Sequence, residues 1–158
     1  MHQEAASASA SEPRRRTVAL DADEALRLLA GVPLGRIVFT RQALPAVRPV
    51  HHLVDGGDVV VRTHEVAALT LQAGTAGVVV AYEADEIDPE ARLGWSVVVT
   101  GYCSPVTDRE EAARYRALLR PWSDRQTDHV VRIHPDLVTG VRLIADRPDP
   151  DDRPAPGD

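Results

Sequence analysis

The amino-acid sequence predicts a mainly β protein: a small antiparallel barrel, closed or partly closed, of six to seven strands with a few short helices. Three observations predict this class. Short valine-rich runs recur along the chain, and valine favours strands. The connections between most of these runs are short, which favours antiparallel pairing. No strand–helix–strand alternation runs through the chain, so a parallel doubly wound sheet is not expected.

The chain of 158 residues has the size of a single domain. Residues 1–16 are small and polar with a basic end, and they predict a disordered arm. Residues 146–158 are rich in proline and aspartate and predict a disordered acidic tail. The folded domain is therefore expected over residues 17–145.

The first predicted element is a helix that Asp21 or Asp23 can cap. Its apolar positions are Leu26, Leu28 and Leu29. Gly31 and Pro33 then stop the helix before the first strand, because both residue types disfavour a helix interior.

Strands are predicted at residues 35–41, 45–55 and 58–63. Gly56 and Gly57 lie between the last two strands and can adopt the positive φ values of a tight hairpin turn. A two-residue turn fixes the register, so each side chain of the hairpin can be assigned to one of two faces.

A short helix is expected at residues 65–74, where Gly74 ends it. Two long strands follow at residues 77–88 and 94–106. Their alternating apolar residues are typical of strands with one buried face.

A third helix is expected at residues 109–119, which Asp108 can cap. Its alternating arginines and glutamates are expected on a solvated face. Residues 129–144 predict one or two final strands, broken near Pro135 and Gly140.

The composition excludes several classes of function. The formal net charge is −6, so nucleic acid and anionic membranes are not expected as partners. The chain has no lysine, and all 18 of its cationic side chains are arginine. Chemistry through a lysine Schiff base is therefore impossible. Any phosphate that a cationic side chain holds must be held by arginine.

Cys103 is the only cysteine, which excludes an internal disulfide and a cysteine-rich metal site. No apolar run reaches the ~18 residues of a membrane span, and the N-terminus lacks an apolar signal-peptide core. The expected location is the cytoplasm. The chain also lacks the sequence motifs of serine hydrolases, P-loops and dinucleotide-binding folds.

In the predicted register of the hairpin, His51 faces Arg62 and shares the outer face with Leu53 and Val60. The other face is rich in valine and is the predicted interior. It carries Val50, His52, Val54, Val59, Val61 and Thr63. Adjacent strand residues point to opposite faces, so His51 and His52 cannot bind one metal ion together. No metal site is expected.

Arg62 and Thr63 end a strand immediately before a helix. Backbone N–H groups at a helix start attract anions, so this guanidinium, this hydroxyl and the helix start could form a phosphate clamp. Glu65 argues against the clamp, because a carboxylate in the first turn competes for the positive helix end. The alternative is a surface arginine followed by a threonine that caps the helix.

Five segments, in their order and spacing, resemble those of a known family: GRIVFT, LPAVRPVHHLVDGGDVVVRT, VAYEADEID, GWSVVVTG and HVVRIHPDLVTGVRL. Over about residues 20–144 the chain resembles the pyridoxamine 5′-phosphate oxidase-like proteins, the flavin-binding split β-barrels, and among them the short bacterial type. The resemblance implies a homodimeric split β-barrel that binds FMN in a cleft between the subunits and acts on a small molecule.

The resemblance also implies a set of cofactor-binding residues. They are Arg48, Pro49, Val50, His51, Arg62, Thr63, Trp95 and Ser96. The strand 48–51 would run along the flavin ring and its ribityl chain, and Arg62 and Thr63 would meet the phosphate. Trp95 and Ser96 would approach from the partner subunit or from the adjoining strand. His51 is a candidate catalytic residue as well, because histidine side chains titrate near neutral pH.

The sequence departs from the family pattern at two places. Relatives usually carry asparagine at the position of His51, and a loop with glycine and lysine after the position of Thr63. Here HEVAAL follows directly and brings Glu65. Loss of one charged hydrogen bond to a phosphate costs about 1.5–3 kcal/mol, which is roughly ten- to a hundredfold in affinity.

Three hypotheses about function follow. The first is an FMN-dependent oxidoreductase. The second keeps the fold but replaces FMN by the deazaflavin F420 or by heme. The third is a non-enzymatic small-ligand-binding dimer that has lost flavin. Substitution of Arg48 or Arg62 separates the hypotheses, because only the cofactor models predict a large loss of binding.

Overall fold

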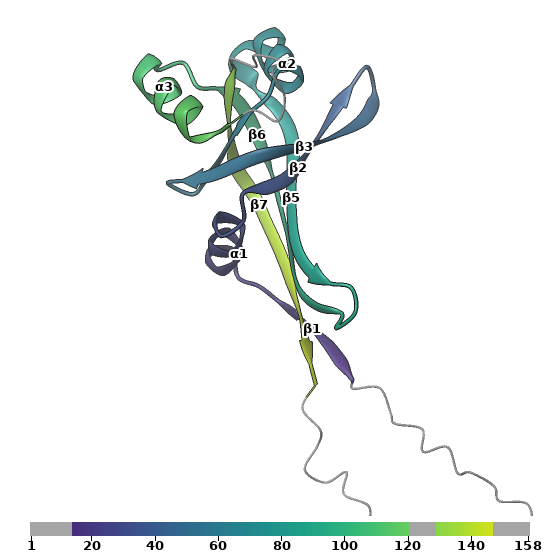
Figure 1. Cartoon of the computed structure of the whole chain (residues 1–158). Helices are drawn as coiled ribbons and strands as arrows, with labels where there is room; N and C mark the ends of the chain where they lie inside the picture. Colours follow the sequence, from purple (N-terminus) through teal and green to yellow (C-terminus); the bar gives the residue numbers. More distant parts are fainter. Residues whose placement is uncertain (1–13, 121–128, 147–158) are drawn as a thin grey trace, which may run out of the picture.

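The computed structural model describes residues 14–120 and 129–146 (Figure 1). In chain order the elements are β1 (Arg15–Ala19), α1 (Ala22–Ala30), β2 (Leu34–Arg41), β3 (Leu44–Asp55), β4 (Asp58–Arg62), α2 (Glu65–Ala73), η1 (Gly74–Ala76), β5 (Val78–Asp88), β6 (Leu93–Pro105), α3 (Arg109–Leu118) and β7 (Val130–Ala145). Every helix and strand predicted from the sequence is present. The suggested break in the last strand is absent, because β7 is continuous over Val130–Ala145.

The strands of this described part form one antiparallel sheet in the order β1-β7-β4-β3-β2-β5-β6. Because β7 also pairs with β6, six of the strands close into a barrel. β1 pairs with the C-terminal end of β7. Figure 1 shows α2 and α3 near one end of this sheet and β1 at the other. The predicted mainly β, antiparallel split barrel is confirmed.

The strand β1 was not predicted from the sequence. It includes Arg15 and Arg16, so the prediction of a disordered arm over residues 1–16 is wrong at these two positions. The backbone N–H of Asp146 donates to the carbonyl of Arg14 at 2.7 Å, so the sheet pairing also continues into the first residue of the predicted tail. The rest of the predicted arm and tail lies outside the described residues.

The hairpin of β3 and β4 has the predicted register, from Asp55 opposite Asp58 to His52 opposite Val61. Gly56 has a φ of 60°, and the following glycine has a φ of 89°. Both values lie in the left-handed region that this turn requires. The valine-rich face is buried in the barrel, as predicted, and His52 is buried with it.

β7 is one continuous strand, so the suggested division into two strands is wrong. Opposite Pro135 the register with β6 shifts by one residue, which leaves Asp136 as a β-bulge. A bulge accommodates proline, which lacks an N–H group for the ladder. Gly140 does not break the strand. A Cβ atom at this glycine would lie 2.9 Å from the Leu20 side chain, so glycine allows the segment before α1 to approach β7.

The buried apolar residues form two clusters. The larger one fills the barrel and includes Leu29 of α1, Trp95 of β6 and Ile133 of β7. The smaller one lies on the outer face of the β3–β4 hairpin. It consists of Val60, Tyr115, Leu119 and Val130, with Leu53 and Val106 packed against it. The face that carries His51 is therefore partly covered by α3.

Two of the helices begin with the predicted aspartate caps. The Asp21 carboxylate accepts from the N–H of Glu24 at 2.8 Å, and Asp108 accepts from the N–H of Glu111 at 2.8 Å. The α2 helix differs, because its N-cap is His64 and no side chain caps it. In the part of the chain that the structure describes, no helix is long and apolar enough to cross a membrane.

Candidate cofactor site

The strand segment from Arg48 to His51 alternates between the two faces of β3. Val50 is buried, whereas Arg48 and Pro49 are exposed and His51 is half-buried. By this alternation Arg48 shares its face with Val50, and His51 lies on the opposite face with Pro49. The four residues expected along a flavin therefore lie on both faces of one strand. Among these four, Arg48 is the residue with a permanent charge.

Arg48 makes a bidentate ion pair with Glu65, the first residue of α2. Its Nε lies 3.0 Å from Oε1 and its Nη2 lies 3.0 Å from Oε2. Arg41 Nη1 lies 3.7 Å from the same Oε2. The chain thus places a carboxylate between two guanidinium groups at the start of a helix.

Arg62 lies at the end of β4, and its Nη1 donates to the carbonyl of Leu119 at 3.4 Å. Nearby, His51 Nδ1 lies 3.2 Å from the carbonyl of Arg120. Both side chains therefore contact the last residues after α3, on the outer face of the hairpin. The structure brings the predicted pair of Arg62 and His51 together.

Thr63 does not join Arg62 in a clamp. Its side chain is buried on the inner face, at 6% exposure, and its backbone N–H donates to the carbonyl of His129 at 3.1 Å. It also does not cap α2, because the N-cap residue is His64. The predicted combination of guanidinium, hydroxyl and helix start is therefore not assembled in the protomer.

Trp95 and Ser96 lie on β6, which pairs with β5 and β7. Trp95 pairs with Arg142 near one end of β7, whereas Arg62 pairs with Val130 at the other end. β6 is three strands from β3 in either direction around the barrel, so neither residue adjoins the Arg48–His51 segment in the sheet. The expectation that Trp95 and Ser96 approach a flavin from the partner subunit or from the adjoining strand stays a prediction. Trp95 is also 6% exposed and belongs to the barrel core.

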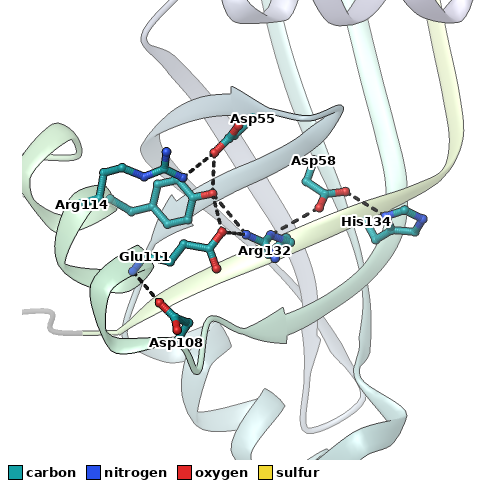
Figure 2. A network of polar contacts seen from close by, with 8 residues as sticks. Asp55, Asp58, Asp108, Glu111, Arg114, Arg132 and His134 are labelled. Carbon is teal, nitrogen blue, oxygen red and sulfur yellow. Dashed lines mark hydrogen bonds and ion pairs between the residues drawn. The ribbon is translucent and has the colours of Figure 1, made fainter.

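A polar network holds α3 against the hairpin (Figure 2). The Tyr115 hydroxyl lies 2.7 Å from Asp55 Oδ2 and 3.0 Å from Glu111 Oε1, so its single proton can go to one of them at a time. Arg114 Nη2 donates to Asp55 at 2.9 Å, and Arg132 Nη2 donates to Glu111 and to the tyrosine oxygen. The network holds α3 in place. The carbonyl groups of Leu119 and Arg120, which follow α3, contact Arg62 and His51.

This network was not predicted from the sequence. The charged residues of α3 were expected on a solvated face, which fits the exposed Arg114 but not Glu111, whose carboxylate pairs with Arg132 from β7. Figure 2 shows that Arg132 lies between Glu111 and Asp58. His134 also contacts Asp58. One signal in the sequence could have indicated it. The predicted hairpin register puts Asp55 opposite Asp58, and two facing carboxylates need nearby cations.

Tyr115→Phe is expected to remove the hydrogen bond that the tyrosine hydroxyl makes to Asp55. The pKa of this carboxyl is held below its ordinary value, mainly by the Tyr115 hydroxyl and further by Arg114 and Arg132. Without the hydroxyl we expect the Asp55 pKa to rise, which a ¹³C NMR titration of side-chain carboxyls measures. Tyr102→Phe is the control, because Tyr102 is exposed on β6 away from this network. An unchanged Asp55 pKa in Tyr115→Phe would contradict the network as drawn.

Two other reactive groups lie in the core and take no part in the candidate site. Burial raises the pKa of the Cys103 thiol to about 12, so the sulfur is protonated at neutral pH and is a poor nucleophile. His52 is bonded to the carbonyl of Leu29 at 2.7 Å, as expected for a satisfied buried histidine. Residues 14–120 and 129–146 contain no group of three metal-ligating side chains in a binding arrangement.

The chemistry of the exposed donors fits an anion. Arg48 already holds a carboxylate through two parallel hydrogen bonds, which is the geometry that guanidinium offers to carboxylates and phosphates. Arg41 adds a second positive charge to this place. A cofactor with an anionic tail therefore has matching donors here, provided that Glu65 moves aside or shares them.

Comparison with known proteins finds relatives of this chain. A family model described as pyridoxamine 5′-phosphate oxidase matches residues 21–142. An uncharacterized protein of Mycobacterium tuberculosis is 56% identical over 135 residues, which cover 84% of this chain and 89% of that protein.

Two solved structures are similar over most of the chain. One is a protein of Corynebacterium glutamicum described as a candidate pyridoxamine 5′-phosphate oxidase, with 32% identity, a TM-score of 0.67, and coverage of 82% of this chain and 99% of that one. The other is the FAD binding protein from Mycobacterium smegmatis, with 31% identity, a TM-score of 0.58, and coverage of 80% and 98%.

Proposed function

The chain belongs to the pyridoxamine 5′-phosphate oxidase family, and from this premise we propose that it binds a flavin and acts as an oxidoreductase on a small molecule. The observation that carries the proposal is the pair of guanidinium groups, Arg41 and Arg48, that together surround one anion. The FAD binding protein from Mycobacterium smegmatis, 31% identical, supports a flavin as the ligand. FMN is the first candidate.

In this proposal the flavin supplies the redox chemistry, and the chain's own residues bind and orient it. Arg48 and Arg41 would hold the anionic tail. Pro49 would offer its exposed surface to the ring, and His51 would lie beside it as the candidate for proton transfer, because imidazole can bind or release a proton near neutral pH. Arg62 would contribute positive charge from the outer face of the hairpin.

We further propose that the functional unit is a homodimer with the cofactor between its subunits. Trp95 and Ser96 lie on β6, three strands from β3 in either direction around the barrel. One protomer therefore does not place them beside the Arg48 segment in its sheet. A second copy, related to the first by a two-fold axis, could bring its Trp95 to the Arg48 segment of the first.

The proposed function predicts that the purified protein takes up flavin and that Arg48→Ala weakens this uptake. Removing one charged hydrogen bond to a phosphate costs about 1.5–3 kcal/mol, so we expect a roughly ten- to hundredfold weaker Kd for FMN. Quenching of flavin fluorescence during titration gives the Kd. Light scattering of the same sample gives the mass, which we expect to be twice that of the chain.

Arg27→Ala is the matched control. Arg27 is an exposed arginine of α1 whose Nε donates to the carbonyl of Asp23, so its loss is expected to leave the Kd for FMN unchanged. Parallel titrations with F420 and with heme, the latter followed by its Soret absorbance, separate the other cofactors. A protein that binds heme or F420 but no flavin would contradict the proposal. A protein that binds none of them would favour a non-enzymatic ligand-binding dimer.

A further inference from the structure

Glu65 occupies the place that the donors of the candidate site offer to an anion. Its two carboxylate oxygens each accept a hydrogen bond of 3.0 Å from Arg48, one from Nε and one from Nη2. Arg41 lies 3.7 Å from Oε2 on the other side. The carboxylate therefore has the contacts that a bound phosphate group would have.

The position of Glu65 on its helix strengthens this comparison. It is the first residue of α2, and the N-cap residue His64 makes no side-chain hydrogen bond to the helix start. The positive end of a helix stabilises a nearby negative charge. Two guanidinium groups thus hold a single carboxylate at a helix start that no side chain caps.

This carboxylate is not buried. Its side chain is 32% exposed, and the side chain of Arg48 is 45% exposed. The carboxylate can therefore swing into solvent, where water replaces its hydrogen bonds, and a ligand can approach the two arginines from outside. Glu65 resembles a resident anion that an incoming anion must displace or share donors with.

We propose that Glu65 sets the charge selectivity of the flavin site by competing with the ligand's phosphate. This inference rests on the proposed function. A phosphate monoester carries about −1.5 to −2 charges near pH 7. The diphosphate of a dinucleotide carries one charge on each of its two adjacent phosphates, and riboflavin carries none. Repulsion from Glu65 therefore disfavours FMN and FAD but does not act on riboflavin.

Glu65→Gln tests the proposal, because glutamine keeps the size of the side chain and an oxygen acceptor for Arg48 but removes the charge. We expect the Kd for FMN to improve about tenfold or more. The Kd for FAD should also improve, and the Kd for riboflavin should not change. Fluorescence quenching measures all three values. Increasing salt should reduce the difference between the two proteins for FMN.

Glu110→Gln is the matched control. Glu110 is also an exposed acidic residue in the first turn of a helix, but it belongs to α3. Its substitution is expected to change none of the three Kd values. The thermal unfolding temperature of each variant without ligand measures how much the Arg48–Glu65 pair contributes to stability by attaching α2 to β3.

The outcomes distinguish this inference from the proposed function. If both proteins bind flavins and Glu65→Gln changes the three Kd values equally or not at all, the carboxylate has only a structural role and the inference is wrong, while the proposed function stands. If neither protein binds FMN, FAD or riboflavin, the proposed function is wrong and the inference falls with it.

Discussion

Gly101→Ala is expected to abolish the native fold or to lower its stability severely. Gly101 lies on β6 opposite the bulge in β7, and a Cβ atom there would lie 1.9 Å from the carbonyl oxygen of His134 and 3.1 Å from the amide nitrogen of Asp136. Both are backbone atoms, which cannot move aside as a flexible side chain can. Overpacking commonly costs about 1–3 kcal/mol and occasionally more, and we expect this substitution at or above the upper end.

The effect is large relative to the total, because native domains have a free energy of unfolding of only about 5–15 kcal/mol. β6 and β7 pair from Gly94 opposite Leu143 to Pro105 opposite Val131, so a forced separation at Gly101 affects the pairing that closes the barrel. Urea unfolding followed by circular dichroism measures the loss.

Gly31→Ala is the matched control for this substitution. Gly31 follows α1 with a φ of −78°, and a Cβ atom there would lie 3.3 Å from its nearest neighbour, the Leu28 carbonyl oxygen. We therefore expect a change of no more than about 1 kcal/mol. A Gly101→Ala protein with the unfolding midpoint of the unsubstituted chain would mean that β6 and β7 can shift apart at the bulge without loss of the barrel.

Most of the fold was predictable because its signals are local. The Gly56–Gly57 turn fixed the hairpin register, and the alternation of side chains then assigned His51 and His52 to opposite faces. Aspartate caps marked two helix starts. The strand β1 gave no such signal, because its five residues include two arginines and it is extended only where the end of β7 pairs with it. Pairing of this kind is a tertiary effect that sequence propensity does not contain.

The candidate site was less predictable because it depends on distances between elements. The sequence brought Glu65 into the argument as a competitor for the helix start, but it did not show that Arg48, 17 positions earlier, would form a bidentate pair with it. Likewise, Arg114 contacts Asp55 across 59 positions in the chain. Such contacts follow from how the hairpin, α2 and α3 pack, and no local pattern specifies that packing.

Loss of the buried His52 ring is the second substitution with a large expected effect. His52 Nε2 donates to the carbonyl of Leu29 at 2.7 Å, since a carbonyl oxygen cannot donate. In the neutral ring Nδ1 is then the acceptor for the Tyr82 hydroxyl at 2.7 Å, whose single proton can go instead to the Val50 carbonyl at 3.1 Å. The ring thus joins the end of α1 to β3 and β5. His52→Ala removes these bonds and leaves a cavity, so we expect a loss of about 3–5 kcal/mol in the free energy of unfolding.

The same residue predicts a dependence of stability on pH. Burial lowers the pKa of His52 from its ordinary value of 6.5, and the neighbouring His51 lowers it further, against the opposing effect of the Leu29 carbonyl. Between about pH 6.5 and the lower folded pKa, the unfolded chain therefore binds a proton that the folded chain does not bind. The free energy of unfolding should fall as the pH falls through this interval, and the decrease should end below the folded pKa.

His52→Leu isolates this contribution, because leucine fills much of the ring's volume but does not titrate. Between pH 6.5 and the folded pKa of His52, we expect its free energy of unfolding to vary less with pH than that of the unsubstituted chain. The difference in free energy of unfolding between the two proteins should shrink as the pH falls. His64→Ala is the control, since His64 is exposed and its side chain makes no capping hydrogen bond to α2. Its free energy of unfolding should stay within about 0.5 kcal/mol of that of the unsubstituted chain. Because the effect requires a neutral imidazole between Leu29 and Tyr82, an identical pH slope in His52→Leu and in the unsubstituted chain would mean that His52 is charged, or exposed to water, in the folded protein.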